Sequence, residues 1–238
     1  LAIGTWIKVW PAGLIVAALL LLRRRWSVAL GATVFSAVTV VIALVLGAGT
    51  NLLSFIGFQG SRGLQIEAPV ATVYLWLASL GLAHAQVYFD QDLLTYQVQG
   101  DGALAVTSAM TVVMFAAIIA VVAVVLLRRS TVASIRYLPA VSLALVMALI
   151  AFNKVGSPQY FCWIIPPILL GLIIDRRRFL PVAVLGLIAT VLTQAIYPWM
   201  YEDLLSLKAT ALAILSLRNL AEVALFGYAL ALVTRRAG

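Results

Sequence analysis

The chain has 238 residues, of which 64% are hydrophobic and 10% charged, and its mean hydropathy is +1.12. A soluble domain cannot bury that much apolar surface, so the composition excludes a soluble globular protein and predicts a polytopic membrane protein. The net charge of +8 does not indicate a nucleic-acid partner, because the basic residues form four clusters at the ends of apolar runs, as in cytoplasmic loops. The clusters are Arg23–Arg25, Arg128–Arg129 with Arg136, Arg176–Arg178, and Arg235–Arg236.

Seven apolar runs approach the length of about 20 residues that a membrane span requires. We therefore expect an all-α fold, a polytopic transmembrane bundle of about seven spans in one domain over residues 1–238. The chain starts at Leu1 with no signal-peptide pattern, so we expect a fragment that lacks its N-terminal spans. The runs are 2–22, 27–49, 103–127, 137–152, 161–174, 180–198 and 209–233.

The first run contains the sequence IKVWP at residues 7 to 11. Pro11 is predicted to kink the helix, because it lacks a backbone N–H. A charge within a span usually faces a cavity or a partner, which makes Lys8 a candidate substrate-binding residue. The alternative is that the Lys8 side chain extends to the membrane surface.

A polar segment, GFQGSRGLQIEAP, covers residues 57 to 69. Arg62 suits phosphate or sugar recognition, and the neighbouring Gly60 and Gly63 would let the backbone approach a ligand. Glu67 could orient a hydroxyl group or act as a base. The alternative is a surface ion pair between Arg62 and Glu67.

The run at 68–83 is short, and charge decides how it lies. If it crossed the membrane, every later arginine cluster would be external. If it lies in the interface or re-enters, all four clusters are cytoplasmic and six of the eight acidic residues are external. We therefore expect one external region, 50–102, with an interfacial helix at 68–83 whose surroundings include Tyr74, Trp76, Tyr88 and Phe89.

His84, Asp90 and Asp92 stand in the same external region. One histidine and two carboxylates could ligate a metal ion, but this spacing is unspecific. We predict a solvated loop and assign no metal.

The sequence FNKVGSPQYFCW, residues 152 to 163, is a polar connection between two short apolar runs. A loop below the headgroups is tolerated only where protein or water surrounds it. Gly156, Ser157 and Pro158 fit a turn, an N-cap and a first helical residue, so a helix should begin near Gln159. Its free N–H groups beside Lys154 would attract an anion such as a lipid phosphate. The alternative is that these residues only cap helix ends.

Arg218 and Glu222 are four residues apart in the last run. Mutual charge neutralisation within the bundle is the expected role. The alternative is a secondary transporter or lipid flippase that uses Arg218, Glu222 and Lys8 as charges along a path.

Three of these segments together resemble glycosyltransferase family 87, which comprises multispanning mannosyltransferases of the GT-C class. NKVGSPQYFCWIIP is similar to the family signature (N)KV-x-SPQY-xxW-xxP, and also to a stretch of the glycosylphosphatidylinositol mannosyltransferases. SRGLQIEAP resembles the element R-x-LQ-(I/V)-ES, and IKVWP resembles IK-(L/V)-(Y/W)-P. The three matches follow in the expected order, although Ala68 stands where the family usually has serine.

The resemblance implies a sugar transfer, usually of mannose, from a polyprenyl-phosphate donor to a lipid- or glycan-linked acceptor on the extracytoplasmic face of the cell membrane. It implies no cofactor and no nucleotide sugar. The substrate-binding residues would be Lys154, Ser157, Gln159, Tyr160, Arg62, Gln65, Glu67 and Lys8.

In the family the catalytic aspartate belongs to a first external loop, which we expect to precede Leu1. The catalytic base is therefore left unassigned, and Glu67 would at most contact the acceptor. A non-catalytic relative that retains the lipid pocket is a further alternative.

Overall fold

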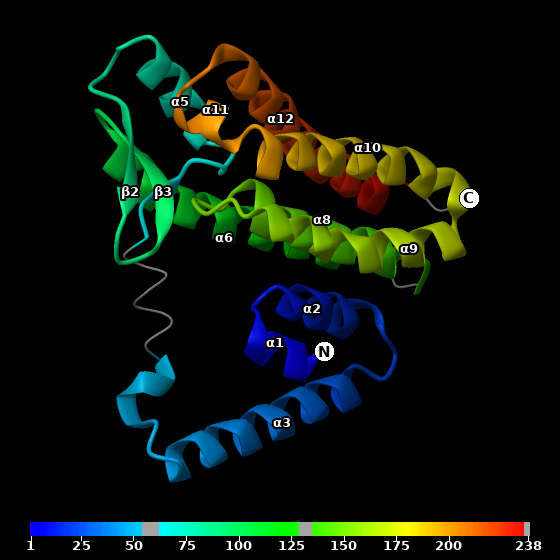
Figure 1. The fold of residues 1–238 in the computed structure, drawn as a ribbon. Coiled ribbons are helices and arrows are strands. Elements are labelled where there is room, and N and C mark those ends of the chain that lie inside the picture. The colour runs from blue at the N-terminus through cyan, green and yellow to red at the C-terminus, as the bar shows by residue number, and fades with distance from the viewer. Residues whose placement is uncertain (54–61, 129–134, 236–238) are drawn as a thin grey trace.

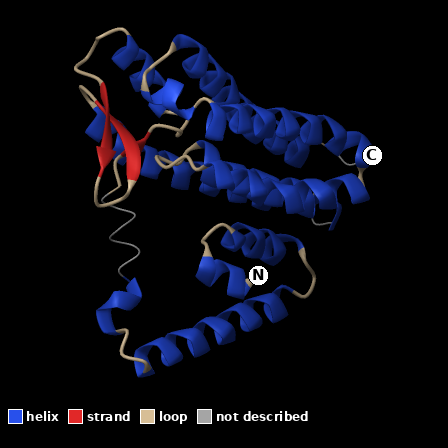
Figure 2. Cartoon of the chain, viewed as in Figure 1, coloured by secondary structure: helices blue, strands red, loops and turns tan. Residues whose placement is uncertain are grey.

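The computed structural model describes residues 1–53, 62–128 and 135–235. Helices that run roughly alongside one another form the body of the molecule, and a small β-sheet lies at one end (Figures 1 and 2). The helices of the body are α1 (Ala2–Ile7), α2 (Pro11–Leu21), α3 (Arg25–Val45), α6 (Ala103–Leu127), α8 (Leu138–Ala151), α9 (Ile165–Ile174), α10 (Arg176–Gln194) and α12 (Ala209–Thr234).

The central helix is α8, which packs against α2, α6, α9 and α12. Its sequence, LPAVSLALVMALIA, is apolar on every side, as expected of a helix that is surrounded by protein. Twelve of its fourteen residues are buried. By contrast, none of the 21 residues of α3 is buried, and this helix lies at the outer edge of the body, beyond α1 and α2 (Figure 1).

Four helices are long and apolar enough to cross a membrane: Arg25–Val45, Ala103–Leu127, Arg176–Trp199 and Ala209–Thr234. These correspond to four of the seven predicted spans. The other three predicted spans form shorter apolar helices, Pro11–Leu21, Ile135–Ala151 and Pro158–Ile174. The short length of the runs around the polar connection is therefore confirmed, whereas a total of seven spans is not.

The predicted break near Pro11 is confirmed. Helix α1 ends at Ile7, and α2 begins with Pro11 as its first residue, a position that needs no N–H donor. Lys8 is exposed in the connection between the two helices.

The external region is not purely helical, so the prediction of an all-α fold was incomplete. Strands β1 (Leu64–Gln65), β2 (Gln86–Asp90) and β3 (Thr95–Gln99) form an antiparallel sheet in the order β1-β3-β2. Val87 and Leu64 both pair with Val98. Helix α5 (Ala71–Ser79) has nine residues, which at 1.5 Å per residue is too short to cross a bilayer.

Helix α5 docks on α12 through polar contacts. The Trp76 indole N–H donates to the Ser216 hydroxyl at 3.0 Å, and the Asn219 amide donates to the Thr72 hydroxyl at 2.7 Å. Tyr74 is buried. The other two predicted interfacial aromatic residues also have protein partners, since Tyr88 donates to Gln97 and Phe89 packs edge-on against Tyr96.

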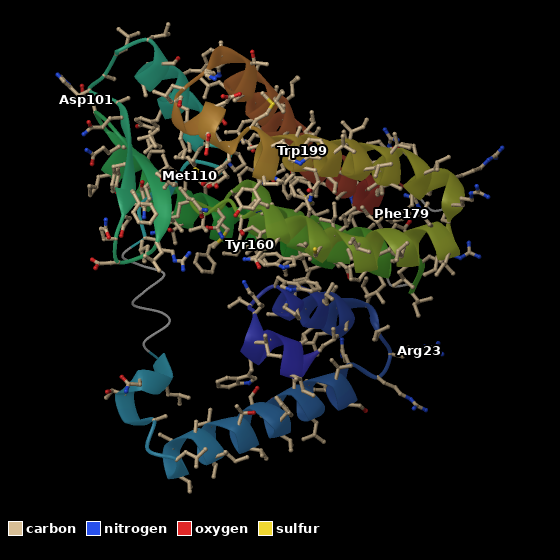
Figure 3. All side chains as sticks on the ribbon, viewed as in Figure 1. Arg23, Asp101, Met110, Tyr160, Phe179 and Trp199 are labelled. Atoms are coloured by element: carbon tan, nitrogen blue, oxygen red, sulfur yellow. The ribbon has the colours of Figure 1, made fainter. Side chains whose placement is uncertain are left out.

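The arginine clusters gather at one end of the bundle and the sheet lies at the other. Arg128 donates to the Thr234 carbonyl, Arg178 to the Leu232 carbonyl, and Tyr137 to the Arg235 carbonyl. Figure 3 shows Arg23 at this end and Asp101 at the opposite one. Arg129 and Arg236 lie outside the described residues. The shared end agrees with the predicted topology, and its cytoplasmic location stays a prediction.

Candidate functional site

Two polar segments that are far apart in the sequence meet at the sheet end of the bundle. The Gln65 backbone N–H donates to the Lys154 carbonyl at 3.1 Å. A Cβ on Gly156 would lie 2.4 Å from the Glu67 carbonyl carbon and 2.5 Å from the Ala68 nitrogen. Gly156 therefore allows direct backbone contact between the connection 152–157 and the segment 64–68.

The connection itself is enclosed by protein, as the sequence predicted. Lys154, Val155 and Gly156 are all buried. The Asn153 side chain accepts from the Val155 N–H at 3.0 Å and donates to the Leu149 carbonyl at 3.3 Å. These bonds satisfy backbone groups that the end of α8 leaves open.

The helical segment after this connection begins at the predicted Ser157-Pro158 boundary. Ser157 is the N-cap and Pro158 the first residue of the 3₁₀-helix η3 (Pro158–Ile164), which continues into α9. The Ser157 side chain makes no capping hydrogen bond. The Ser-Pro boundary is thus confirmed, but the first turns are 3₁₀-helical rather than α-helical.

Glu67 is the buried acid of the site, with 4% of its surface exposed. Tyr201, in the short helix α11 (Tyr201–Leu205), donates its hydroxyl to Glu67 Oε1 at 2.9 Å. Within the part of the chain that the structure describes, Glu67 Oε2 has no hydrogen-bond partner. Burial raises the pKa of Glu67, and the Tyr201 hydrogen bond and the Arg218 charge oppose this shift.

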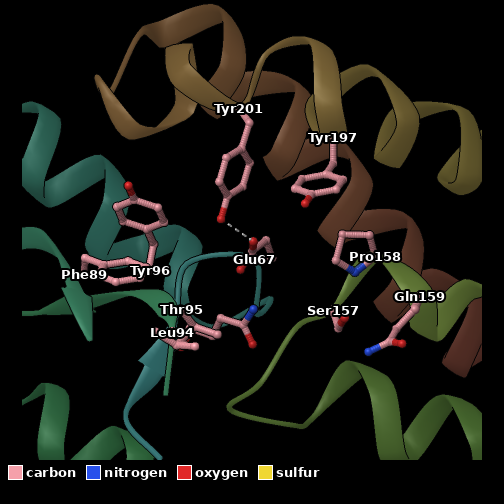
Figure 4. Close-up of a pocket in the computed structure, with 11 residues that line it drawn as sticks. Glu67, Phe89, Leu94, Thr95, Tyr96, Ser157, Pro158, Gln159, Tyr197 and Tyr201 are labelled. Carbon is pink, nitrogen blue, oxygen red and sulfur yellow. Dashed lines mark hydrogen bonds between the residues drawn. The ribbon is translucent and has the colours of Figure 1, made fainter. Parts of the chain in front are cut away.

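A pocket of about 420 Å³ lies beside Glu67 (Figure 4). Its walls come from both polar segments, from the hairpin β2–β3 and from the turn after α10. They are Gln65, Glu67, Phe89, Leu94, Thr95, Tyr96, Ser157, Pro158, Gln159, Tyr197 and Tyr201. Four predicted site residues, Gln65, Glu67, Ser157 and Gln159, are therefore brought together in one cavity.

Arg62 and Lys154 do not line this pocket, although both belong to the segments that form it. Lys154 is buried. Its pKa is lowered by burial and then by the positive charge of Arg62, so the two cations are close enough to repel one another. The Arg62 Nε is also buried, and it has no hydrogen-bond partner among the described residues.

The segment IKVWP, residues 7 to 11, is connected to the polar connection through stacked aromatic rings. Trp10 stacks on Trp163 with ring centroids 5.8 Å apart, and Trp163 stacks on Tyr160 at 4.0 Å. Tyr160 is thus connected to Trp10 through the Trp163 ring, and it does not line the pocket. Lys8 does not line it either.

Arg218 joins the elements that surround the site, a role that the sequence did not reveal. Its Nη1 donates to the Glu67 backbone carbonyl at 2.7 Å, its Nε donates to Thr193 at 3.3 Å, and its guanidinium lies 5.1 Å from the Phe161 ring centroid. The predicted ion pair with Glu222 is confirmed at 3.1 Å.

The sequence also missed the tyrosines of the pocket. Tyr197 and Tyr201 come from the sequence IYPWMYED at the end of the run 180–198. An aromatic cluster followed by two acids is a signal that could have identified them. Tyr96 belongs to the unpredicted strand β3.

Gly63, beside Arg62, does not have the role that the sequence suggested. Gly63 does accommodate a close neighbour, but that neighbour is the Gln97 amide, which a Cβ would meet. Gly60 lies outside the described residues.

Asp90 accepts from the N–H groups of Asp92 and Leu93 in the hairpin turn, and His84 pairs with Asp101, so the three residues His84, Asp90 and Asp92 do not form a cluster.

No known protein family, curated protein or solved structure matches this chain.

Proposed function

We propose that this protein is a membrane glycosyltransferase that moves a sugar from a polyprenyl-phosphate donor to a lipid- or glycan-linked acceptor. The observation that carries the proposal is the joint pocket. Two segments that resemble family 87 elements contact each other through Gln65 and Lys154, 89 positions apart, and together they supply five of the residues that line one cavity. The third segment contributes Trp10, which stacks next to them.

The donor phosphate would bind beside the pocket, at Arg62 and Lys154. Two neighbouring cations that repel each other, one of them buried, favour an anion that contacts both. The phosphate of the donor lipid is the leaving group of the transfer. Positive charge at this place would stabilise the transition state as negative charge accumulates on the phosphate.

We assign no catalytic base among the described residues. Glu67 lies at the pocket and is suited to contact an acceptor or donor hydroxyl. The resemblance assigns the base to an external loop that precedes the segment equivalent to 2–22.

The transporter alternative has weaker support. Arg218 is held by Glu222, Thr193 and the Glu67 carbonyl, so its charge is engaged in fixed contacts. Lys8, the third charge of the suggested path, is exposed between α1 and α2. A buried ion network that joins several elements is more typical of a structural role than of a transport path.

The test is sugar transfer by the full-length protein in native membranes, with a radiolabelled polyprenyl-phosphate-mannose donor. We expect Lys154→Ala and Arg62→Ala each to lower the transfer rate by about 100-fold, the typical effect of removing one group that stabilises transition-state charge. Lys208→Ala is the matched control, because Lys208 is an exposed cation that pairs with Asp203 and does not line the pocket. Transfer at wild-type rates by both variants, with equal folded yield, would overturn the phosphate assignment.

A further inference from the structure

The walls of the pocket are chemically distinct from the basic pair beside it. None of the eleven lining residues is a lysine, arginine or histidine. The walls instead offer tyrosine rings and hydroxyls, the side-chain amides of Gln65 and Gln159, and the carboxylate of Glu67. A phosphate placed here would meet a carboxylate and no cation, so the cavity itself is unsuited to an anion.

The carboxylate has unused capacity to accept hydrogen bonds. A carboxylate offers about four acceptor sites on its two oxygens, and the Tyr201 hydroxyl donates to Glu67 Oε1. Glu67 Oε2 is buried without a partner among the described residues. Buried polar atoms are nearly always satisfied, and a ligand in the adjacent pocket is one partner that would satisfy this oxygen.

Glu67 is also held in position, at its side chain and at its backbone. Tyr201 donates to Oε1, and Arg218 donates to the backbone carbonyl of the same residue. Burial, followed by the negative charge of Glu67, raises the pKa of Tyr201, so its hydroxyl keeps its proton and stays a donor. A fixed acceptor beside a cavity can select a ligand that carries hydroxyl donors.

We propose that the pocket is a subsite for an uncharged sugar ring, in which Glu67 accepts hydrogen bonds from ring hydroxyls while the phosphate stays outside at Arg62 and Lys154. A neutral polyhydroxylated ring matches the amides, the tyrosine hydroxyls and the ring faces of Tyr96, Tyr197 and Tyr201. The volume of about 420 Å³ lies within the usual range for small-molecule sites, roughly 300–1,000 Å³. This assignment rests on the proposed function. The sugar ring of the donor would bind in the pocket and its phosphate at the basic pair beside the pocket.

Saturation-transfer-difference NMR on the full-length protein in lipid nanodiscs tests the subsite. The probes are methyl α-mannoside and, as competitor, inorganic phosphate. We expect saturation transfer to the mannoside with the wild-type protein and an affinity about tenfold lower with Glu67→Gln, because a hydrogen bond to a charged group is lost. Tyr201→Phe should also weaken binding, because it removes the hydroxyl that donates to Glu67, whereas the exposed control Glu202→Gln should leave binding unchanged.

Three results would overturn the subsite: no saturation transfer with the wild-type protein, equal binding by Glu67→Gln, or displacement of the mannoside by phosphate. These outcomes are separate from failure of the proposed function. If the subsite fails but Lys154→Ala and Arg62→Ala still impair transfer, the enzyme assignment stands. If the mannoside binds through Glu67 but the protein transfers no sugar from the lipid donor, the subsite stands and the enzyme assignment fails.

Discussion

Arg218 has five N–H donors in a rigid planar group, and the structure uses them to link separate parts of the chain. Its donors reach the Glu67 carbonyl, Thr193 in α10 and Asn219 in α12. Asn219 continues the network to Thr72 in α5. A lysine at this position has a single charged nitrogen and cannot bridge these directions at once.

Glu67 gives a prediction on pH. Its ordinary pKa is 4.5, and burial raises the value in the folded state. Between these two pKa values the folded protein binds more protons than the unfolded chain, so the free energy of unfolding contributed by Glu67 falls as pH rises through this window. Glu67→Gln cannot titrate. We expect the melting temperature of Glu67→Gln, relative to wild type, to increase from pH ~4 to pH ~8.

Thermal unfolding in detergent across that pH range measures this difference. Glu202→Gln, which removes an exposed carboxylate from α11, should give a difference from wild type that varies little with pH. A difference for Glu67→Gln that stays constant, or that falls with pH, would contradict a raised pKa at this residue.

The element that organises the site is the connection 152–157 between α8 and η3. It lies against the backbone of Glu67 and Ala68, where even one added carbon atom finds no room. Its contact with β1 through Lys154 and Gln65 ties the end of the central helix to the sheet. The pocket therefore depends on a backbone-to-backbone approach that only glycine permits.

Gly156→Ala tests this approach. The new Cβ would meet backbone atoms that cannot rotate away, so we expect a loss of stability of about 1–3 kcal/mol, as for other overpacked sites, and reduced sugar binding. Gly227→Ala in α12 is the matched control, because a Cβ there meets nothing within 4 Å; it should be neutral or stabilising by about 0.5–1 kcal/mol. Chemical or thermal unfolding of both variants decides, and equal stability would contradict the close contact.

The sequence predicted the elements whose signals are local. Pro11 and Ser157-Pro158 mark helix boundaries through covalent geometry, and the apolar runs give the long helices. The hairpin β2–β3 was missed although Val87 and Phe89 alternate with polar positions, because the region was interpreted only through its charge and its aromatic residues. Its register depends on pairing with the next strand, as in the pair Val87 and Val98, and a search for membrane spans does not consider such pairing.

The contact between Glu67 and Tyr201 could not be predicted in the same way. The two residues are 134 positions apart, and no local period connects them. Tyr201 reaches Glu67 because the chain turns after α10 and returns along α12, so its position follows from the tertiary packing. By contrast, Glu67, Ser157 and Gln159 were predicted from local chemistry, a carboxylate near an arginine and a Ser-Pro helix boundary, and Gln65 was added by the resemblance to a family element.

At the scale of the whole molecule, the segments that line the pocket and the segments that carry the arginine clusters lie at opposite ends of the helices (Figure 1). Arg128, Arg178 and Arg235 are joined at one end through the C-terminal turn of α12. Six of the eight acidic residues are in segments at the other end. Under the positive-inside rule this polarity predicts that the pocket faces the outside of the cell and that the arginines face the cytoplasm.

Cysteine labelling in intact cells tests this orientation. The native Cys162 is exposed and is first replaced by serine. Gln91→Cys lies in the exposed turn between β2 and β3, and Ile135→Cys lies in the 3₁₀-helix η2 (Ile135–Tyr137), where the native side chain is 60% exposed. Because α6 separates the two positions, an impermeant maleimide should label Gln91→Cys in intact cells and Ile135→Cys only after permeabilisation. The reverse pattern would put the pocket in the cytoplasm, and labelling of both from outside would mean that α6 does not cross the membrane.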